Sequence, residues 1–246
     1  MKLHTVGFCG VDDSVNLLLL RNLADPQLPG AKLRLAAHLC GQDCLRQCFS
    51  GVVESQGYIE YVRSGRALAG DVAHISGLHA LLGFGRAQLN PTKANQASDW
   101  QPETAARGLR ELAAALPSVE FILQVNEETQ ELFRALFHSE PAPPNLAVLL
   151  DASCGLGVAP GSWTAPPKVV RRFGFAGGLG PDSVLQQLEG MAAACQEHHR
   201  DASVWVDMES RIRSKSVTGA DVFDLTLIRQ VAELVLKSGW LLRSSL

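Results

Sequence analysis

Short apolar runs and helix-like amphipathic patterns alternate along most of the chain. Apolar runs of strand length occur at residues 3–10, 33–39, 86–90, 119–125, 145–150, 169–176 and 203–207. The segments between and after them predict helices at residues 15–23, 42–49, 74–82, 104–116, 128–137, 182–197 and 222–237. Apolar strands that alternate with helices are typical of a parallel sheet covered on its faces. The pattern therefore predicts an α/β fold.

The length of the chain favours one particular α/β architecture. Its 246 residues are close to the roughly 250 of a single (β/α)8 TIM-type barrel, so we expect one barrel domain over residues 1–246. Seven strands are clear, and residues 58–62 would supply the eighth, as strand three, if they form a strand. If they do not, the barrel lacks one βα unit in its N-terminal half and has an open seam.

Composition narrows the class of partner. The net charge of −3 argues against general binding to nucleic acid or to an anionic membrane. The longest apolar runs, at residues 17–20 and 147–150, are far too short to span a bilayer. Six cysteines without an N-terminal secretion signal are typical of reduced intracellular thiols. We therefore expect a cytoplasmic protein with neither nucleic acid nor membrane as a partner.

Two turns near the end of the chain carry the clearest functional pattern. Gly177 and Gly178 end one apolar run, and a helix-like segment follows from Asp182, a good N-cap residue. Glycine lets backbone N–H groups approach a ligand, and a helix start carries partial positive charge that suits an anion. Ser210 and Arg211 follow the next apolar run. In a (β/α)8 barrel, phosphate binds after strands seven and eight, so these two turns predict a phosphate cradle.

Motifs at the ends of the predicted strands resemble those of one barrel family. They are Phe8-Cys9-Gly10-Val11, Gln88-Leu89-Asn90, Leu149-Leu150-Asp151 with Gly155-Leu156-Gly157 and Trp163 behind it, Ala176-Gly177-Gly178-Leu179, and Val206-Asp207-Met208-Glu209-Ser210. In their order and spacing they resemble phosphoribosylanthranilate isomerase, a (β/α)8 enzyme of tryptophan biosynthesis. The similarity covers residues 6–11 and most of 86–224.

The resemblance implies a reaction and a role for several residues. Cys9 stands where the family has its general base, and Asp151 stands where it has its general acid. The implied reaction is an Amadori rearrangement of a phosphoribosylamine to a 1-deoxyribulose phosphate, an intramolecular aldose–ketose isomerisation. The phosphate would be held by Gly177, Gly178, Ser210 and Arg211. The partner would be a small sugar phosphate, with no cofactor and no metal, and the protein a monomer or homodimer.

The sequence departs from the family pattern at four places. The family's last turn normally has two hydroxyl residues and a glycine, and here Glu209 and Arg211 occupy two of those places. Asn90 stands where histidine is usual. The family's carboxylate-binding arginine after strand two has no counterpart, because no arginine follows residues 33–39 until Arg46. The alternative is a non-catalytic barrel relative that binds a phosphorylated metabolite or a partner protein. A third is a shortened product whose open edge dimerises or aggregates.

Several candidates also have simpler explanations. Cys9 could be a small buried hydrophobic residue, and Asp207 could merely hydrogen-bond neighbouring backbone. Arg86 could reach a substrate together with Asn90, or it could form an ion pair at the barrel rim. The spacing of Cys40, Cys44 and Cys48 would align the three on a helix, but known metal and cluster sites bring cysteines closer, so we interpret them as core-facing thiols.

Overall fold

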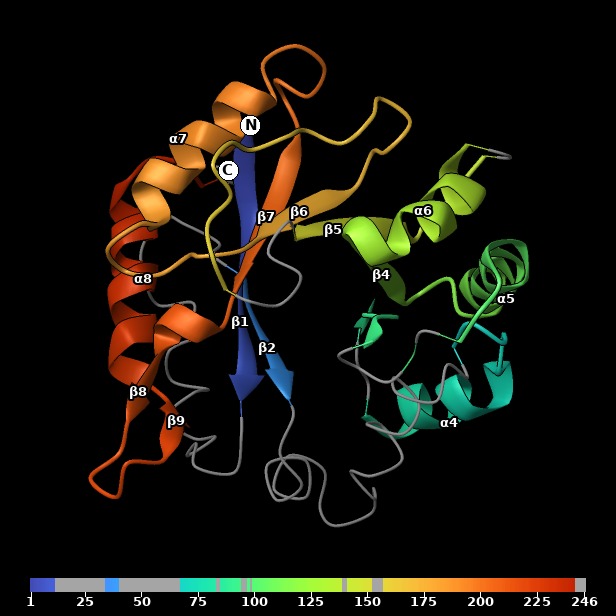
Figure 1. Ribbon diagram of the computed structural model, residues 1–246, viewed down its shortest axis with the longest axis horizontal. Helices are drawn as coiled ribbons and strands as arrows, with labels where there is room; N and C mark the ends of the chain where they lie inside the picture. The colour runs from blue at the N-terminus through green and yellow to red at the C-terminus, as the bar shows by residue number, and fades with distance from the viewer. Residues whose placement is uncertain are drawn as a thin grey trace.

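A single parallel sheet forms the centre of the structure. The computed structural model describes residues 1–11, 34–39, 67–82, 85–93, 97, 99–138, 141–151 and 157–241. Within them the seven strands of the sheet are β1 (Lys2–Val11), β2 (Arg34–Leu39), β3 (Arg86–Leu89), β4 (Glu120–Val125), β5 (Leu146–Asp151), β6 (Phe173–Ala176) and β7 (Ser203–Met208). The order is β2-β1-β7-β6-β5-β4-β3, and every neighbouring pair is parallel (Figure 1). All seven strands predicted as clear are confirmed, whereas residues 58–62 lie outside the described part.

Helices cover the outer side of this sheet. They are α4 (Val72–Leu82), α5 (Pro102–Ala115), α6 (Gln130–Phe137), α7 (Val184–Ala194) and α8 (Leu225–Lys237), with short 3-10 turns η2 (Glu127–Thr129) and η3 (Ser210–Ile212). Figure 1 places α7 and α8 beside β1 and β7, and α4, α5 and α6 along the other end of the sheet. The helices predicted at residues 15–23 and 42–49 lie outside the described part.

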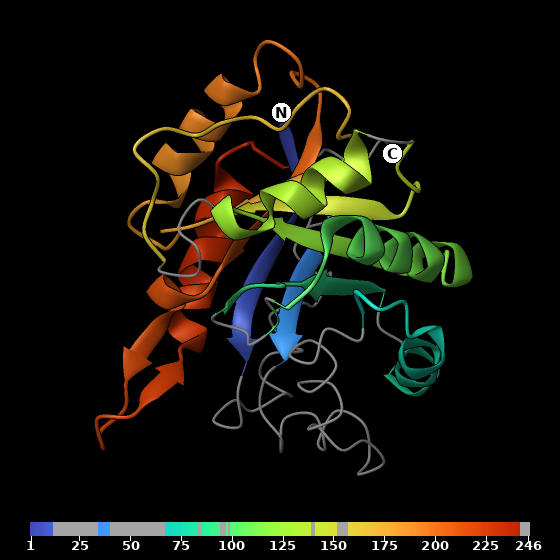
Figure 2. The same cartoon turned by 45° about the vertical axis from the view of Figure 1, so that its right-hand side comes forward.

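The sheet curls strongly. In a flat sheet β3 and β7 would lie four strand spacings apart, which is roughly 19 Å. Yet the guanidinium carbon of Arg86 on β3 lies 4.4 Å from the centre of the Trp205 ring on β7. The two strands face each other across the concave side of the sheet, and the same curl is visible when the molecule is turned (Figure 2).

The two faces of the sheet have different environments. The convex face packs against the helices in one large apolar core, in which Leu3, Val6 and Phe8 of β1 are almost completely buried. The concave face carries a small separate apolar cluster of Ile122, Ala147, Leu149 and Trp205. Because side chains alternate between faces, the residues two positions further along these strands also point to the concave side. Those residues supply the candidate site.

Closure of the sheet is not observed in the described residues. β2 and β3 stand at the two ends of the strand order, and each is paired there with one neighbouring strand. The structure therefore establishes a mixed α/β fold with a curled parallel sheet, which is a coarser statement than the expected (β/α)8 barrel. Among the same residues, no helix has the length and apolarity needed to cross a membrane.

Three local expectations need correction. Helix α7 begins at Val184 with Ser183 as its N-cap residue, so Asp182 does not cap it. Strand β6 starts at Phe173 rather than at residue 169, because Val170 N–H bonds Pro167 O in a turn. A hairpin of β8 (Arg213–Lys215) and β9 (Asp221–Phe223) precedes α8, where a helix was expected from residue 222, and it projects from the molecule in Figure 1.

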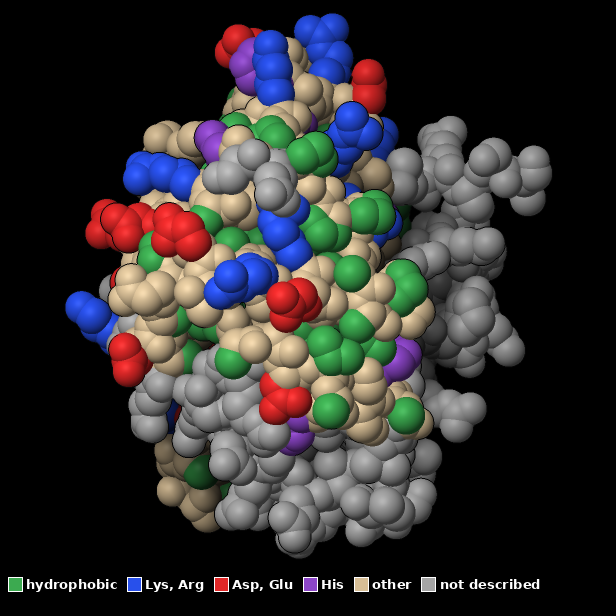
Figure 3. All heavy atoms as spheres, turned by 90° about the vertical axis from the view of Figure 1, so that its right-hand side faces the viewer, with side chains coloured by type: hydrophobic (Ala, Val, Ile, Leu, Met, Phe, Trp, Pro, Cys, Tyr) green, Lys and Arg blue, Asp and Glu red, His purple; other side chains and the backbone are tan. Residues whose placement is uncertain are grey.

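Figure 3 shows the outer surface at the end of the molecule that carries α4, α5 and α6. Basic, acidic and apolar side chains are interspersed on the part of this face that is coloured by type. Such mixing is ordinary for a protein surface. The described surface of this side therefore gives no reason to place the functional site there, in contrast to the concave side of the sheet.

Candidate functional site

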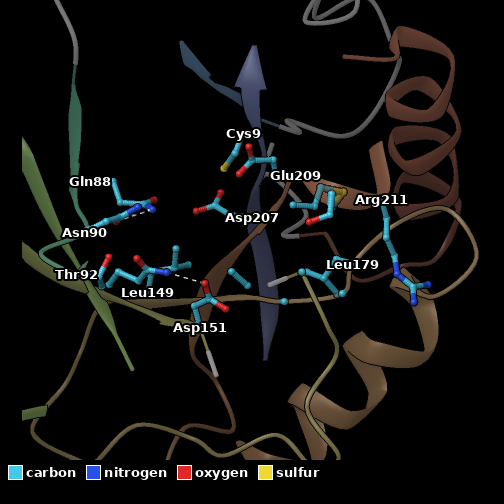
Figure 4. Close-up of a pocket in the computed structure, with 17 residues that line it drawn as sticks. Cys9, Gln88, Asn90, Thr92, Leu149, Asp151, Leu179, Asp207, Glu209 and Arg211 are labelled. Atoms are coloured by element: carbon cyan, nitrogen blue, oxygen red, sulfur yellow. Dashed lines mark hydrogen bonds between the residues drawn. The ribbon is translucent and has the colours of Figure 1, made fainter. Parts of the chain in front are cut away.

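A cavity of about 280 Å³ opens at the carboxyl ends of the strands, on the concave side of the sheet. Figure 4 shows the residues that line it. They are Cys9, Gln88, Asn90, Thr92, Gln124, Leu149, Asp151, Gly157, Ala176, Gly177, Gly178, Leu179, Asp207, Met208, Glu209, Ser210 and Arg211. Ligands of parallel α/β sheets bind at this edge. The sequence-predicted candidates therefore converge here, with one exception.

Asp151 is the last residue of β5 and is held by a neighbouring strand. Its side chain is 6% exposed, and its Oδ2 accepts a hydrogen bond of 2.6 Å from Gln124 Nε2 on β4. A buried carboxylate needs such a partner to offset its lost hydration.

Asp207 is a second buried carboxylate in the same cavity. It is 1% exposed, and its Oδ2 accepts a 3.0 Å hydrogen bond from the indole N–H of Trp205, two residues earlier on β7. Gly7 is its register partner on β1, and a Cβ there would lie 1.7 Å from Asp207 Oδ1. The Asp207 carboxylate therefore occupies the space beside β1 that a side chain at position 7 would fill, and β1 has glycine there.

Cys9 lies at the end of β1, two residues beyond Gly7, and is partly exposed in the cavity. The next residue, Gly10, has a φ of 80°, a left-handed conformation that glycine adopts without strain. Its carbonyl accepts a 2.8 Å hydrogen bond from Arg213 Nη1, and Arg213 also pairs with Asp221 on β9. The arginine thus holds the end of β1 that carries Cys9.

The predicted phosphate cradle is a tight glycine turn. Gly177 and Gly178 have φ values of 120° and 64°, and both line the cavity. The chain that returns from β5 packs directly on this turn, because a Cβ on Gly178 would lie 2.2 Å from Ala159 N. On the other side of the cradle, a Cβ on Gly157 would lie 1.9 Å from Ser210 Oγ. Several glycines are therefore needed for the segments to approach this closely.

Arg211 borders the cavity but does not point into it. Its side chain is exposed and passes Gly180, where an added Cβ would meet Arg211 Cβ at 2.5 Å. In Figure 4 the guanidinium extends away from Cys9 and Asp207. Glu209, in contrast, lies beside Cys9 in the same view. The sequence placed both residues at the last turn and could not distinguish these directions.

Arg86 is the candidate that the structure does not bring to the cavity. It is the first residue of β3, so it lies at the opposite edge of the sheet from the carboxyl ends. Its Nε donates to Glu120 Oε2 at 2.6 Å, and Arg172 Nη1 lies 3.0 Å from Glu120 Oε1. Of the two explanations considered for Arg86, the ion pair is the one observed.

Gln88, Thr92 and Gln124 also line the cavity and were given no role from the sequence, whereas Asn90 beside them was a predicted substrate contact. Gln88 and Asn90 come from the end of β3 and its turn, and Gln88 Nε2 donates to Asn90 Oδ1 at 3.0 Å. Gln124 and Thr92 are 6% exposed. The sequence did contain a signal for such residues, namely a polar residue inside an otherwise apolar strand. Gln124 in Glu120–Val125 is an example. Such a residue needs a buried partner.

Three carboxylate side chains, those of Asp151, Asp207 and Glu209, line the cavity. Among the residues that the structure describes, no three His, Cys, Asp or Glu side chains are grouped closely enough to hold a metal ion. Of the described cysteines, Cys9 lines the cavity and Cys195 is buried in the core, where burial raises the pKa of its thiol. Residues Cys40, Cys44 and Cys48 lie outside the described part.

Comparison with known proteins does not add a family to this geometry. No protein-family model, no curated protein and no solved structure matches the chain. Conclusions about its activity therefore rest on the residues of the cavity and on their chemistry.

Proposed function

We propose that the chain is a (β/α)8-type barrel lacking one βα unit and that it is an intramolecular aldose–ketose isomerase resembling phosphoribosylanthranilate isomerase. Its reaction would be the Amadori rearrangement of a phosphoribosylamine to a 1-deoxyribulose phosphate. The observation that carries the proposal is that Cys9, Asp151 and the Gly177–Gly178 turn, which are far apart in sequence, line one cavity. A thiol, a carboxyl group and an anion cradle are the three parts that this reaction needs.

The proposed chemistry uses the two reactive groups in sequence. Asp151 gives its proton to the ribose ring oxygen, the bond from that oxygen to C1′ breaks, and an iminium ion forms. Cys9, as thiolate, then removes the C2′ proton, and the electron pair of that C–H bond neutralises the iminium. The resulting enamine–enol tautomerises to the ketose. Gln124 contributes by fixing the orientation of the Asp151 carboxyl group through its hydrogen bond to Oδ2.

The phosphate of the substrate would bind at the glycine turn. The backbone N–H groups of Gly177 and Gly178 and the hydroxyl of Ser210 are suited to anionic oxygens. Arg211 would add charge from the rim of the cavity, since its side chain lies along Gly180. The register of β5 and β6 places Asp151 opposite Ala176, so the proposed acid is next to the glycine turn.

The test is turnover of freshly generated phosphoribosylanthranilate, followed by the loss of its fluorescence. We expect Cys9→Ala and Asp151→Asn each to lower kcat by at least about a hundredfold, because positioned acids and bases contribute factors of this size. Cys195→Ala is the matched control, because Cys195 is buried in the helix-packed core away from the cavity. A folded wild-type protein without turnover of this or any related phosphoribosylamine would contradict the proposal.

A specific observation favours the second candidate, a non-catalytic barrel relative that binds a phosphorylated metabolite. Glu209 lies in the cavity close to Cys9, and a carboxylate there opposes both a thiolate and an anionic substituent. In this case phosphate or ribose 5-phosphate would raise the melting temperature without turnover, and Gly178→Ala would abolish the shift.

A further inference from the structure

The end of β1 that carries Cys9 pairs irregularly with its neighbour β2. The two strands are in register up to Phe8↔Ala37, and the next register pair is Val11↔Leu39. Three steps along β1 therefore match two steps along β2, so β1 contains one extra residue and forms a bulge. Bulges redirect side chains and are frequent next to active sites. Cys9 lies in this bulge, so the direction of its thiol depends on how the bulge is held.

A side chain from another part of the chain contacts this bulge. On the β7 side, the last register pair of β1 is Phe8↔Met208, one residue before Cys9. Beyond it, Arg213 Nη1 donates a 2.8 Å hydrogen bond to the carbonyl of Gly10. The guanidinium lies directly against this backbone, because a Cβ on Gly10 would lie 3.0 Å from Nη1. The donor is charged, which makes the hydrogen bond stronger than one between neutral groups.

Arg213 is itself held firmly in the β8–β9 hairpin. Its side chain is 16% exposed, its Nε donates to the Asp221 carboxylate, and its Nη2 donates to Asp221 O at 3.2 Å. The hydrogen bond from Arg213 is the largest cause that lowers the pKa of Asp221 below its ordinary value of 3.8, so the pair is ionised at neutral pH. Next to it, Ile212 is completely buried in the core. A residue that positions another must be locked in this way.

We infer that Arg213 is a positioning residue, which fixes the bulge through the Gly10 carbonyl and thereby directs the Cys9 thiol into the cavity. The described residues that line the cavity do not include Arg213, so it acts through the backbone of β1 rather than on the substrate. The inference rests on the proposed function for the role of Cys9 as the base. It goes beyond that function by assigning a part in it to the hairpin.

Hydrogen exchange tests the hold on the bulge without any assumption about activity. The Gly10 carbonyl and the Val11 N–H belong to one peptide group, so loss of the hydrogen bond from Arg213 loosens that group. We expect Arg213→Met to speed amide exchange at the end of β1 by at least about tenfold, because a hydrogen bond from a charged group is lost. Overlapping peptides analysed by mass spectrometry resolve these amides. Unchanged exchange there would overturn the inference.

The matched control is Lys215→Met in the same hairpin strand. Lys215 is two residues further along β8, its side chain is 71% exposed, and its Nζ lies 3.6 Å from Asp221 Oδ1. This substitution removes an ion pair with the same carboxylate, so it reports the effect of weakening the hairpin. Exchange at the end of β1 should stay as in wild type. An increase equal to that of Arg213→Met would assign the effect to the hairpin as a whole and overturn the inference.

Turnover of phosphoribosylanthranilate tests the consequence for Cys9. We expect Arg213→Met to lower kcat by at least about tenfold and to change KM by less than about threefold, because a misplaced base impairs proton transfer rather than binding. Arg213→Lys keeps a cationic donor and should recover kcat to within about fivefold of wild type. Lys215→Met should change neither constant. An unchanged kcat in Arg213→Met, or a raised KM alone, would overturn the inference.

A double variant separates positioning of the thiol from a general structural role. In a Cys9→Ala protein there is no thiol to direct, so adding Arg213→Met should lower the remaining turnover by less than about twofold. A further tenfold loss in that background would show that Arg213 does not act through Cys9. If Arg213→Met does not fold, Arg213→Gln, which is shorter and uncharged but polar beside Asp221, replaces it in every comparison.

The two proposals can fail separately, because amide exchange does not depend on catalysis. Faster exchange in Arg213→Met, with no turnover of any phosphoribosylamine by the wild-type protein, would remove the isomerase and leave Arg213 as the residue that fixes the bulge. Turnover by the wild-type protein together with an unchanged kcat in Arg213→Met would leave the isomerase and remove the positioning role.

Discussion

Gly7 shows how one residue without a side chain makes room for a functional group on another strand. The Asp207 carboxylate occupies the space that a Cβ on Gly7 would need. Both residues are in register at the carboxyl end of the sheet, so the close approach is built into the strand pairing. The sequence shows a glycine in an apolar strand, which indicates a close backbone approach but does not identify the approaching group.

We therefore expect Gly7→Ala to destabilise the protein by about 2 kcal/mol, the usual cost of overpacking a filled site. Gly77→Ala is the matched control, because nothing lies within 4 Å of its added Cβ. It lies inside α4 and should stabilise by about 0.5–1 kcal/mol through helix propensity. Urea unfolding of both variants measures the difference. A Gly7→Ala protein as stable as wild type would contradict the placement of Asp207.

At the residue scale the sequence identified the positions of most cavity residues but not the directions of their side chains. Cys9, Asp151 and the two glycines are at strand ends, where a parallel sheet brings them together. Arg86 begins its strand rather than ending it, so its guanidinium lies at the far edge, against Glu120. Arg211 is at the cavity but extends away from its centre. Such directions depend on packing between strands, which a single sequence does not specify.

At the scale of elements, the helix that follows the β8–β9 hairpin has the clearest cap. Asp224 is the N-cap of α8, and its Oδ1 accepts from the backbone N–H of Thr226 at 2.8 Å and of Leu227 at 3.3 Å. Burial acts to raise the pKa of Asp224, but hydrogen bonds from Ser214 and from these amides outweigh it, and the pKa lies below its ordinary value of 3.8. The ionised form is therefore stabilised by folding.

This cap predicts a pH-dependent stability. A folded-state pKa below the unfolded value adds stability above about pH 4, and that stability is lost as the pH falls through the lowered pKa. Asp224→Ala should cost about 1 kcal/mol at neutral pH, and the difference from wild type should shrink below about pH 4. Urea unfolding across this range measures it. Asp182→Ala is the control, and because Asp182 caps no helix here, a comparable loss would contradict our assignment.

Element types were predictable because the strands are apolar and the helices periodic. The strands of the sheet are covered on both its concave and its convex face, so their sequences are nearly continuous apolar runs. The β8–β9 hairpin was missed because its strands, Arg213–Lys215 and Asp221–Phe223, are short and mostly polar. The start of α7 was placed too early because Asp182 has the composition of a cap while Ser183 occupies the position.

At the scale of the whole molecule, closure of the barrel is the property that the sequence left open. The strand order places β2 and β3 at the two ends, where an additional strand would close the sheet. The candidate for that strand, residues 58–62, is bounded by Gly57 and by Ser64-Gly65, but it is too short for its pattern to distinguish a strand from the end of a helix. Order and direction of the other strands follow from local pattern and from the handedness of βαβ units. Whether one more βα unit is present depends on long-range strand pairing with β2 and β3, which the local sequence pattern does not determine.

Hydrogen exchange distinguishes an open from a closed sheet. If β3 is an edge strand, its outward amide groups face solvent, and we expect them to exchange at least about ten times faster than those of β6 and β7, which pair on both sides. Mass spectrometry of exchanged peptides that cover residues 86–89, 173–176 and 203–208 makes the comparison. Equal protection of all three would show that β3 has a second partner and that the barrel closes.

The position of β1 in the sheet has a consequence for how the protein is made. β1 pairs with β7 from Lys2↔Ser203 onward, although this partner is synthesised about 200 residues later. At a synthesis rate of 5–20 residues per second, β1 waits roughly 10–40 s for that partner. Cys9 and Asp207 therefore share a cavity only after β7 has been synthesised, roughly 200 residues after β1.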